Sequence, residues 1–157
     1  QQEFMEEAGL VKLPEVLEDV RQDLDAIIKS SGMELEIDLS GCEFELIRFS
    51  EKNMRSVVYN LLSNTIKYRS PDRVPQVLIR CEATATHHIL VVKDNGLGLK
   101  PVQARQLFTM FKRFHDHVEG SGIGLYMVKK MVENAGGKIE VESELGVGTT
   151  FYVYFKK

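Results

Sequence analysis

The chain has 157 residues, of which 43% are hydrophobic and 27% charged, and its formal net charge is −3. This balance is typical of one globular domain that is long enough to bury a core. The net charge argues against a dedicated nucleic-acid or anionic-membrane binder, whose contact surface needs excess Lys and Arg.

The amino-terminal third predicts one helix and two strands. Pro14 suits the first turn of a helix, since its missing N–H would be unpaired there. Apolar residues follow at helical spacing until Gly32 ends the run. Apolar and acidic residues then alternate over 33–39, as in a half-buried strand. A turn leads from there into a second short strand, 44–49.

The middle of the chain predicts a helix, a strand pair and a long excursion. Ser50 suits the N-cap of a helix that carries one apolar stripe and ends near Tyr68. Alternating runs over 76–82 and 88–94 predict an antiparallel pair. The polar stretch 95–121 follows, with only a short helical pattern around Leu107 and Phe108. A stretch of this length is usually a functional lid or a disordered segment.

The last third predicts a helix over 124–135, which Gly136 and Gly137 end, and two strands around 139–145 and 151–155. The whole order favours an α/β (α+β) fold in two layers. We expect a mixed, mostly antiparallel sheet that is covered on one face by about three helices. We expect residues 1–157 to form a single domain, with a lid at about 99–121.

Three short segments could carry chemistry, and the first lies on the second predicted helix. Asn60, Asn64 and Lys67 follow one another at i, i+4 and i+7, away from the apolar stripe. Polar residues on a helix are most often plain solvated surface. As a ligand-facing strip, they would offer an amide oxygen that suits Mg²⁺ and a mobile positive charge for phosphate.

The second segment is 94–99, Asp-Asn-Gly-Leu-Gly-Leu, at the end of a predicted strand. It could be a simple turn. It could also place the Asp94 carboxylate at the floor of a pocket, with Gly96 and Gly98 letting the backbone approach a ligand closely. An ionised carboxylate accepts hydrogen bonds from an exocyclic amine such as that of adenine.

The third segment is 120–125, Gly-Ser-Gly-Ile-Gly-Leu, at the start of the third predicted helix. Glycines there expose N–H groups at the positive end of the helix, which is a natural anion site. A dinucleotide-binding fingerprint would need a strand immediately before it, and here the polar excursion precedes it. The phosphate-binding loop that ends in Gly-Lys-Ser/Thr is absent.

Together the three segments resemble the N, G1 and G2 boxes of the GHKL superfamily. This superfamily covers histidine kinases, gyrase-type and mismatch-repair ATPases and heat-shock chaperones. The stretch 60–68 resembles the N box of histidine kinases, 107–114 (Leu-Phe-Thr-Met-Phe-Lys-Arg-Phe) resembles their F box, and 148–151 (Gly-Thr-Thr-Phe) their terminal element. The resemblance implies the Bergerat-type α/β sandwich with an ATP lid, and ATP and Mg²⁺ as cofactors.

The resemblance also implies roles for individual residues. Asn64 corresponds to the Mg²⁺ ligand and Asp94 to the acceptor of the adenine amine. Lys67 and Arg113 correspond to the catalytic cations, with Arg113 on the γ-phosphate. Thr149 or Thr150 is expected near the adenine. The nucleotide-contacting positions implied are Asn60, Asn64, Lys67, Tyr68, Asp94, Gly96, Gly98, Arg113, Gly120, Gly122, Gly124, Leu125, Thr149 and Thr150.

Asn60 decides between the activities within the superfamily. Hydrolytic members carry a glutamate general base at this position, and an amide cannot accept a proton usefully at neutral pH. The same argument counts against the anti-sigma type of serine kinase. The resemblance therefore implies a protein-histidine kinase that supplies the γ-phosphoryl group of ATP to a histidine. A regulatory ATP-binding module or pseudokinase without phosphotransfer is the alternative.

None of the four histidines lies in a phosphoacceptor pattern. We therefore expect the acceptor on a separate dimerisation domain, a monomeric fragment that is inactive alone, and an intact homodimer that acts on a response regulator. We expect no nucleic-acid partner, and no membrane contact by this domain.

The start of the chain has neither an initiator Met nor a signal peptide, and no apolar run approaches the roughly 20 residues that cross a bilayer. We therefore expect a cytoplasmic segment of a longer protein, with any membrane anchor outside it. Cys42 and Cys81 lack the spacing of a zinc site. We expect reduced thiols, and leave one buried disulfide as the alternative.

Overall fold

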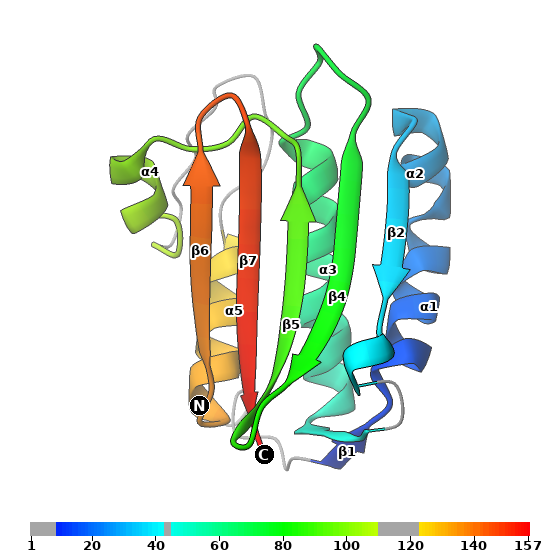
Figure 1. Ribbon diagram of the computed structural model, residues 1–157, viewed down its shortest axis with the longest axis vertical. Coiled ribbons are helices and arrows are strands. Elements are labelled where there is room, and N and C mark those ends of the chain that lie inside the picture. The colour runs from blue at the N-terminus through cyan, green and yellow to red at the C-terminus, as the bar shows by residue number, and fades with distance from the viewer. Residues whose placement is uncertain (1–8, 43–44, 110–122) are drawn as a thin grey trace.

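The computed structural model describes residues 9–42, 45–109 and 123–157 (Figure 1). It has two layers, with a twisted five-stranded sheet in front and α1, α3 and α5 packed behind it. The helices are α1 (Leu13–Asp23), α2 (Asp25–Ser31), α3 (Glu51–Lys67), α4 (Pro101–Arg105) and α5 (Ile123–Asn134). The strands are β1 (Gly9–Val11), β2 (Glu34–Asp38), β3 (Ile47–Phe49), β4 (Gln76–Ala83), β5 (His87–Asp94), β6 (Lys138–Glu144) and β7 (Gly148–Lys156).

The main sheet has the strand order β2-β4-β5-β7-β6. β2 runs parallel to β4, and the other three neighbouring pairs are antiparallel. The predicted mixed, mostly antiparallel sheet with helices on one face is therefore confirmed. β5 lies at the centre, with hydrogen-bonded neighbours on both sides, and Asp94 is its last residue.

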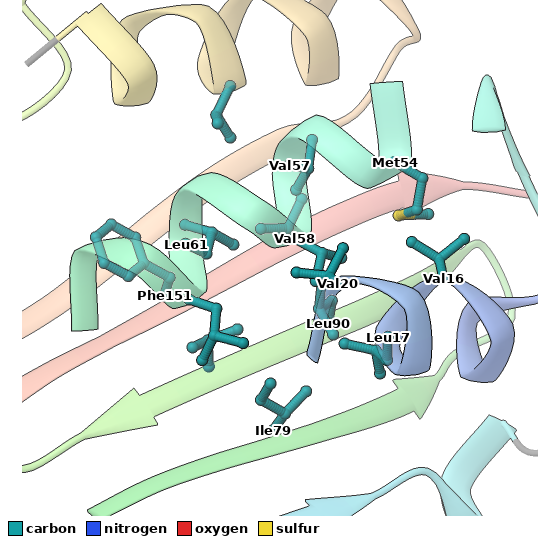
Figure 2. Close-up of a cluster of buried hydrophobic side chains, with 14 of the residues drawn as sticks. Val16, Leu17, Val20, Met54, Val57, Val58, Leu61, Ile79, Leu90 and Phe151 are labelled. Atoms are coloured by element: carbon teal, nitrogen blue, oxygen red, sulfur yellow. The ribbon is translucent and has the colours of Figure 1, made fainter. Parts of the chain in front are cut away.

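Helix α3 is held against the centre of this sheet. Ser50 caps it as predicted, because its Oγ accepts a hydrogen bond of 3.2 Å from the Asn53 amide. The apolar residues of α3 are buried against the sheet and the flanking helices α1 and α5, as Figure 2 shows for Val57, Val58 and Leu61. Full burial of such side chains stabilises a fold by about 1.5–3 kcal/mol each. Because the apolar side of α3 is buried, the direction in which its polar residues point is fixed as well.

The short helix expected around Leu107 and Phe108 is found earlier, as α4, and 106–108 form a turn. Two predicted elements of the amino-terminal third also differ from the structure. The expected single helix up to Gly32 is divided into α1 and α2 at Leu24, which is only 1% exposed. At this break the Leu24 side chain points into the core. Helix α2 itself has no buried residue. The described part of the expected strand 44–49 is β3, and it pairs with β1 in a separate two-stranded sheet. That partner strand was not predicted.

The two cysteines are joined in a disulfide, with their Cα atoms 6.0 Å apart. The expectation of reduced thiols is therefore not met, and the alternative holds. The short 3-10 turn Ser40–Cys42 lies against β4, and a Cβ atom added at Gly41 would collide with the Cys81 carbonyl. This close approach brings the two cysteines together across 39 residues of sequence. Among the helices that the structure describes, none has the length and apolar character needed to span a membrane.

Candidate functional site

A pocket opens beside the end of β5 that carries Asp94. Five parts of the chain meet there: the carboxyl end of α3, the end of β5 with the loop after it, the turn after α4, the start of α5 and the β6–β7 hairpin. The side chains and backbone that line the pocket belong to Asn64, Tyr68, Asp94, Gly98, Leu99, Leu107, Leu125, Thr149 and Phe151. The walls are thus largely leucine and phenylalanine, and a few polar groups converge on them. This composition is typical of a small-molecule site.

Helix α3 contributes two of the predicted site residues to the pocket. Asn64 and Tyr68 lie one turn apart and are both partly buried. The Asn64 amide has no side-chain hydrogen bond to any other described residue, so its oxygen is available to a ligand. Lys67 is exposed in the last turn of α3 and does not line the pocket.

Asn60 lies one turn before Asn64 and faces the start of α5. Its Nδ2 donates a 2.7 Å hydrogen bond to the Ser56 carbonyl, which directs Oδ1 the other way. A Cβ atom added at Gly124 would collide with that oxygen. The absence of a side chain at Gly124 therefore lets the amino-terminal end of α5 approach α3. Asn60 does not line the pocket but lies where these two predicted segments meet.

The Asp94 carboxylate is held by one of its two oxygens. Oδ1 accepts hydrogen bonds from the Gly96 amide at 2.9 Å and from the Thr149 amide at 3.1 Å. Because both bonds use Oδ1, Oδ2 remains for a donor on a ligand. Thr149 therefore holds Asp94 through its backbone amide, and Thr149 is also one of the residues that line the pocket. Thr150 is not among the lining residues, because successive residues of a strand face opposite sides of the sheet.

Gly96 and Gly98 permit two close backbone contacts below the pocket. A Cβ atom added at Gly96 would lie 2.6 Å from the Tyr68 carbonyl oxygen, at the end of α3. Gly98 has a φ of 71°, which disfavours any other residue, and it packs against the Glu144 carbonyl. The loop after β5 is thus pressed between α3 and the β6–β7 hairpin.

Burial raises the pKa of the Asp94 carboxyl group above that of an ordinary aspartate. The two backbone N–H donors and the positive charge of Arg73 oppose this shift without cancelling it. A buried carboxylate with one oxygen unpaired is a costly arrangement for a folded chain. Such perturbed groups in a pocket are typical of functional sites.

The raised pKa has a consequence for stability without nucleotide. The unfolded chain gives up this proton near pH 3.8 and the folded protein at a higher pH, so ionisation lowers folded stability as the pH rises through that window. We expect Asp94→Asn to melt at a higher temperature than the wild type at pH 7. A gain of ~1 kcal/mol would correspond to about 2–4 °C for a domain of this size.

Differential scanning calorimetry of the nucleotide-free proteins measures this difference in melting temperature. It is done at neutral pH and again at a pH below the pKa of an ordinary aspartate. The advantage of the variant should disappear in acid, where both forms are uncharged at this position. A variant that melts below the wild type at pH 7 would contradict the expectation.

Several residues of the site were not among the predicted ones. Ser143 on β6 donates to the Gly148 carbonyl at 3.1 Å and accepts from the Leu99 amide at 2.8 Å, so it ties the loop after β5 to the hairpin. Leu99 and Phe151 also line the pocket. Both lie within segments that the sequence singled out, 94–99 and 148–151, but neither was assigned a contact of its own.

The predicted lid lies only partly within the described residues. Leu107 lines the pocket, and Phe108 packs edge-on against Phe151 with ring centroids 6.2 Å apart. The ammonium group of Lys129 on α5 lies 5.7 Å from the centre of the Phe108 ring. The predicted contacts of Arg113, Gly120 and Gly122 lie outside the described residues. Gly124 and Leu125 are described, and Leu125 lines the pocket.

A one-sided mixed sheet with a carboxylate at the end of its central strand, and a pocket between two helices, defines a nucleotide-binding domain of the GHKL type. The chain belongs to the family described as histidine kinase-, DNA gyrase B-, and HSP90-like ATPase, whose sequence profile matches residues 49–157. Membership of this family implies that the domain binds a nucleotide.

The chain is also similar in sequence to segments of longer curated proteins. Cyanobacterial phytochrome A of a Nostoc species is 42% identical over 95 residues, which are 59% of this chain and 12% of that protein. Sensor protein SrrB of Staphylococcus aureus is 30% identical over 133 residues, or 82% of this chain and 22% of that protein. The chain thus spans less than a quarter of the length of these curated relatives.

The fold is shared with a solved catalytic domain. The catalytic domain of histidine kinase ThkA superposes with a TM-score of 0.82, covering 96% of this chain and 98% of that domain at 20% identity. The chain therefore has the fold of this catalytic domain. The predicted family and fold class are confirmed.

Proposed function

We propose that this domain binds Mg-ATP and supplies its γ-phosphoryl group to a histidine on a separate phosphoacceptor domain of the same kinase. The observation that carries the proposal is the pairing of the Asp94 pocket with an amide, Asn60, where α3 meets α5. The pocket suits adenine, because Oδ2 of Asp94 is available to an exocyclic amine. The Asn60 amide cannot act as a general base, so it does not activate water for hydrolysis of ATP.

The described residues fit the nucleotide and its metal. Asn64 offers the hard oxygen ligand that Mg²⁺ prefers, and it lies one helical turn from both Asn60 and Tyr68. Bound Mg²⁺ would neutralise phosphate charge. Lys67, at the end of α3, supplies a mobile cation at the surface of the same region. We also propose that Arg113, Gly120 and Gly122 contact the phosphates of ATP.

The transfer needs no base from this domain. The bond between the γ-phosphorus and its bridging oxygen breaks, and ADP leaves with the electron pair. A phosphorus–nitrogen bond forms with the imidazole, and the imidazole proton passes to solvent or to a carboxylate of the acceptor domain. Catalysis of this kind rests on positioning and charge neutralisation, which is what the pocket residues offer.

The proposal is tested by incubating this domain and Mg²⁺ with γ-labelled ATP, with and without the acceptor domain of the same protein added in trans. We expect acid-labile label on the acceptor only, little self-labelling and little hydrolysis without the acceptor. An acceptor domain that lacks its histidine is the control. ATP binding without transfer would favour a regulatory module or pseudokinase, and fast stable self-labelling would contradict the proposal.

The partners and setting are part of the same proposal. The acceptor domain and a response regulator would be the protein partners, in a homodimeric kinase whose dimer contacts lie outside a monomeric catalytic domain. The domain would work in the cytoplasm as one unit over residues 1–157. Sedimentation of the isolated domain as a monomer is the expected result.

A further inference from the structure

Arg73 lies in the loop between α3 and β4 and joins two segments that are distant in the sequence. Its guanidinium group donates to the carbonyls of Asn95 and Gly96, each at 2.7 Å. It also donates to the carbonyls of Gly146 at 3.0 Å and Val147 at 3.4 Å. The first pair belongs to the loop after β5, and the second pair belongs to the β6–β7 hairpin.

Each of these two segments provides one of the donors that hold Asp94. The Gly96 amide comes from the loop after β5, and the Thr149 amide comes from the hairpin. The segments also touch directly, since the Gly146 amide donates to the Leu97 carbonyl at 2.7 Å. The distance between the two segments therefore sets the position of the Asp94 carboxylate.

A cationic donor suits the place where the four carbonyl oxygens converge. Oxygens that point at one place repel each other, and a planar guanidinium offers several N–H donors in a fixed arrangement. A lysine would bring the charge but not this fork. The neighbouring Asn95 supports the same loop, because its side chain accepts from the Gln76 amide at 2.8 Å and donates to the Val74 carbonyl at 3.0 Å.

We propose that Arg73 is a positioning residue for the nucleotide base: it clamps the loop after β5 to the β6–β7 hairpin and so holds Oδ2 of Asp94 toward the adenine amine. This inference rests on the proposed ATP binding. Arg73 does not line the pocket, so it acts through Asp94 and Thr149 and not through its own contact with the base.

The test compares the affinities of wild type, Arg73→Ala, Arg73→Lys and Asn95→Ala for ATP and for GTP, by calorimetry in the presence of Mg²⁺. Guanine presents a carbonyl where adenine presents its amine, so a well-placed Asp94 favours ATP. We expect Arg73→Ala to raise the Kd for ATP about tenfold, since a hydrogen bond to a charged group is typically worth that much or more. The preference for ATP over GTP should fall with it.

Two further measurements separate the clamp from a general loss of structure. Arg73→Lys should restore only part of the affinity, because it keeps the charge and loses the fork. Hydrogen exchange of the nucleotide-free Arg73→Ala protein should be faster in 95–97 and 146–149 and unchanged in the core strands. Asn95→Ala loosens the same loop without removing a charge, and it replaces Arg73→Ala if that variant fails to fold. Arg48→Ala, at an exposed position on β3, is the matched control.

The outcomes distinguish the inference from the function on which it rests. Normal ATP binding by the wild type with unchanged affinity and selectivity in Arg73→Ala would overturn the clamp alone. A weaker affinity for ATP and GTP in equal measure would also overturn it, because the base would then not be involved. No ATP binding by the wild type would overturn the proposed function and the clamp together.

Discussion

Replacing Asp94 by Asn should weaken ATP binding by about tenfold to a hundredfold, the range of a lost hydrogen bond to a charged group. The structure explains why so small a change should have a large effect. The Gly96 and Thr149 amides need an acceptor, so the amide oxygen of the variant takes the place of Oδ1. Its NH₂ group then replaces Oδ2 and faces the adenine amine, with donor against donor.

Calorimetric titration with ATP and Mg²⁺ at neutral pH measures this effect. Asp25→Asn, which makes the same chemical change on α2, is the control and should bind as the wild type does. The variant at position 94 should also be more stable than the wild type without nucleotide, so a folding defect cannot explain the loss. Unchanged affinity would remove Asp94 from the adenine site.

Replacing Asn64 by Ala should abolish most of the dependence of ATP binding on Mg²⁺. The Asn64 amide oxygen is the hard donor that we assign to the metal, and no cluster of three or more His, Cys, Asp or Glu side chains in the described ranges could hold it instead. We expect the Kd for Mg-ATP to rise about tenfold or more. The affinity for ATP in the presence of a chelator should change little.

The measurement is a pair of ATP titrations, one with Mg²⁺ and one with a chelator, on each protein. Asn134→Ala, at the exposed end of α5, removes an equivalent amide from a place outside the pocket and serves as the control. If the ratio of the two affinities in Asn64→Ala equals that of the wild type, Asn64 is not the metal ligand.

Local signals predicted most of the fold. The Ser50 cap, the apolar stripe of α3 and the alternating strands each depend on neighbours in the sequence, and each was found where the pattern indicated. The errors share a different cause. The break at Leu24, the pairing of β1 with β3 and the disulfide all depend on contacts between distant segments. Such contacts leave no periodic mark in either partner.

The candidate site divides in the same way. Asp94 follows a strand and precedes glycines, and the structure places it at the floor of the pocket together with Asn64, Tyr68 and Thr149. The sequence left Thr149 and Thr150 as alternatives, since the strand register that separates them comes from pairing with β5. Arg73 was not found, because an exposed arginine in a loop gives no sign that its targets are carbonyls.

The place of Asp94 at the end of β5 links nucleotide binding to the cooperativity of folding. β5 is the central strand, with neighbours on both edges and α3 packed on one face. A central strand typically opens at a free energy close to that of global unfolding, whereas loops and termini can open separately. We therefore expect Asp94 to share the protection of β5, although the adjoining loop 95–97 can open locally. A bound nucleotide acts by mass action on the global equilibrium, and its free energy of binding is shared by every element of the sheet.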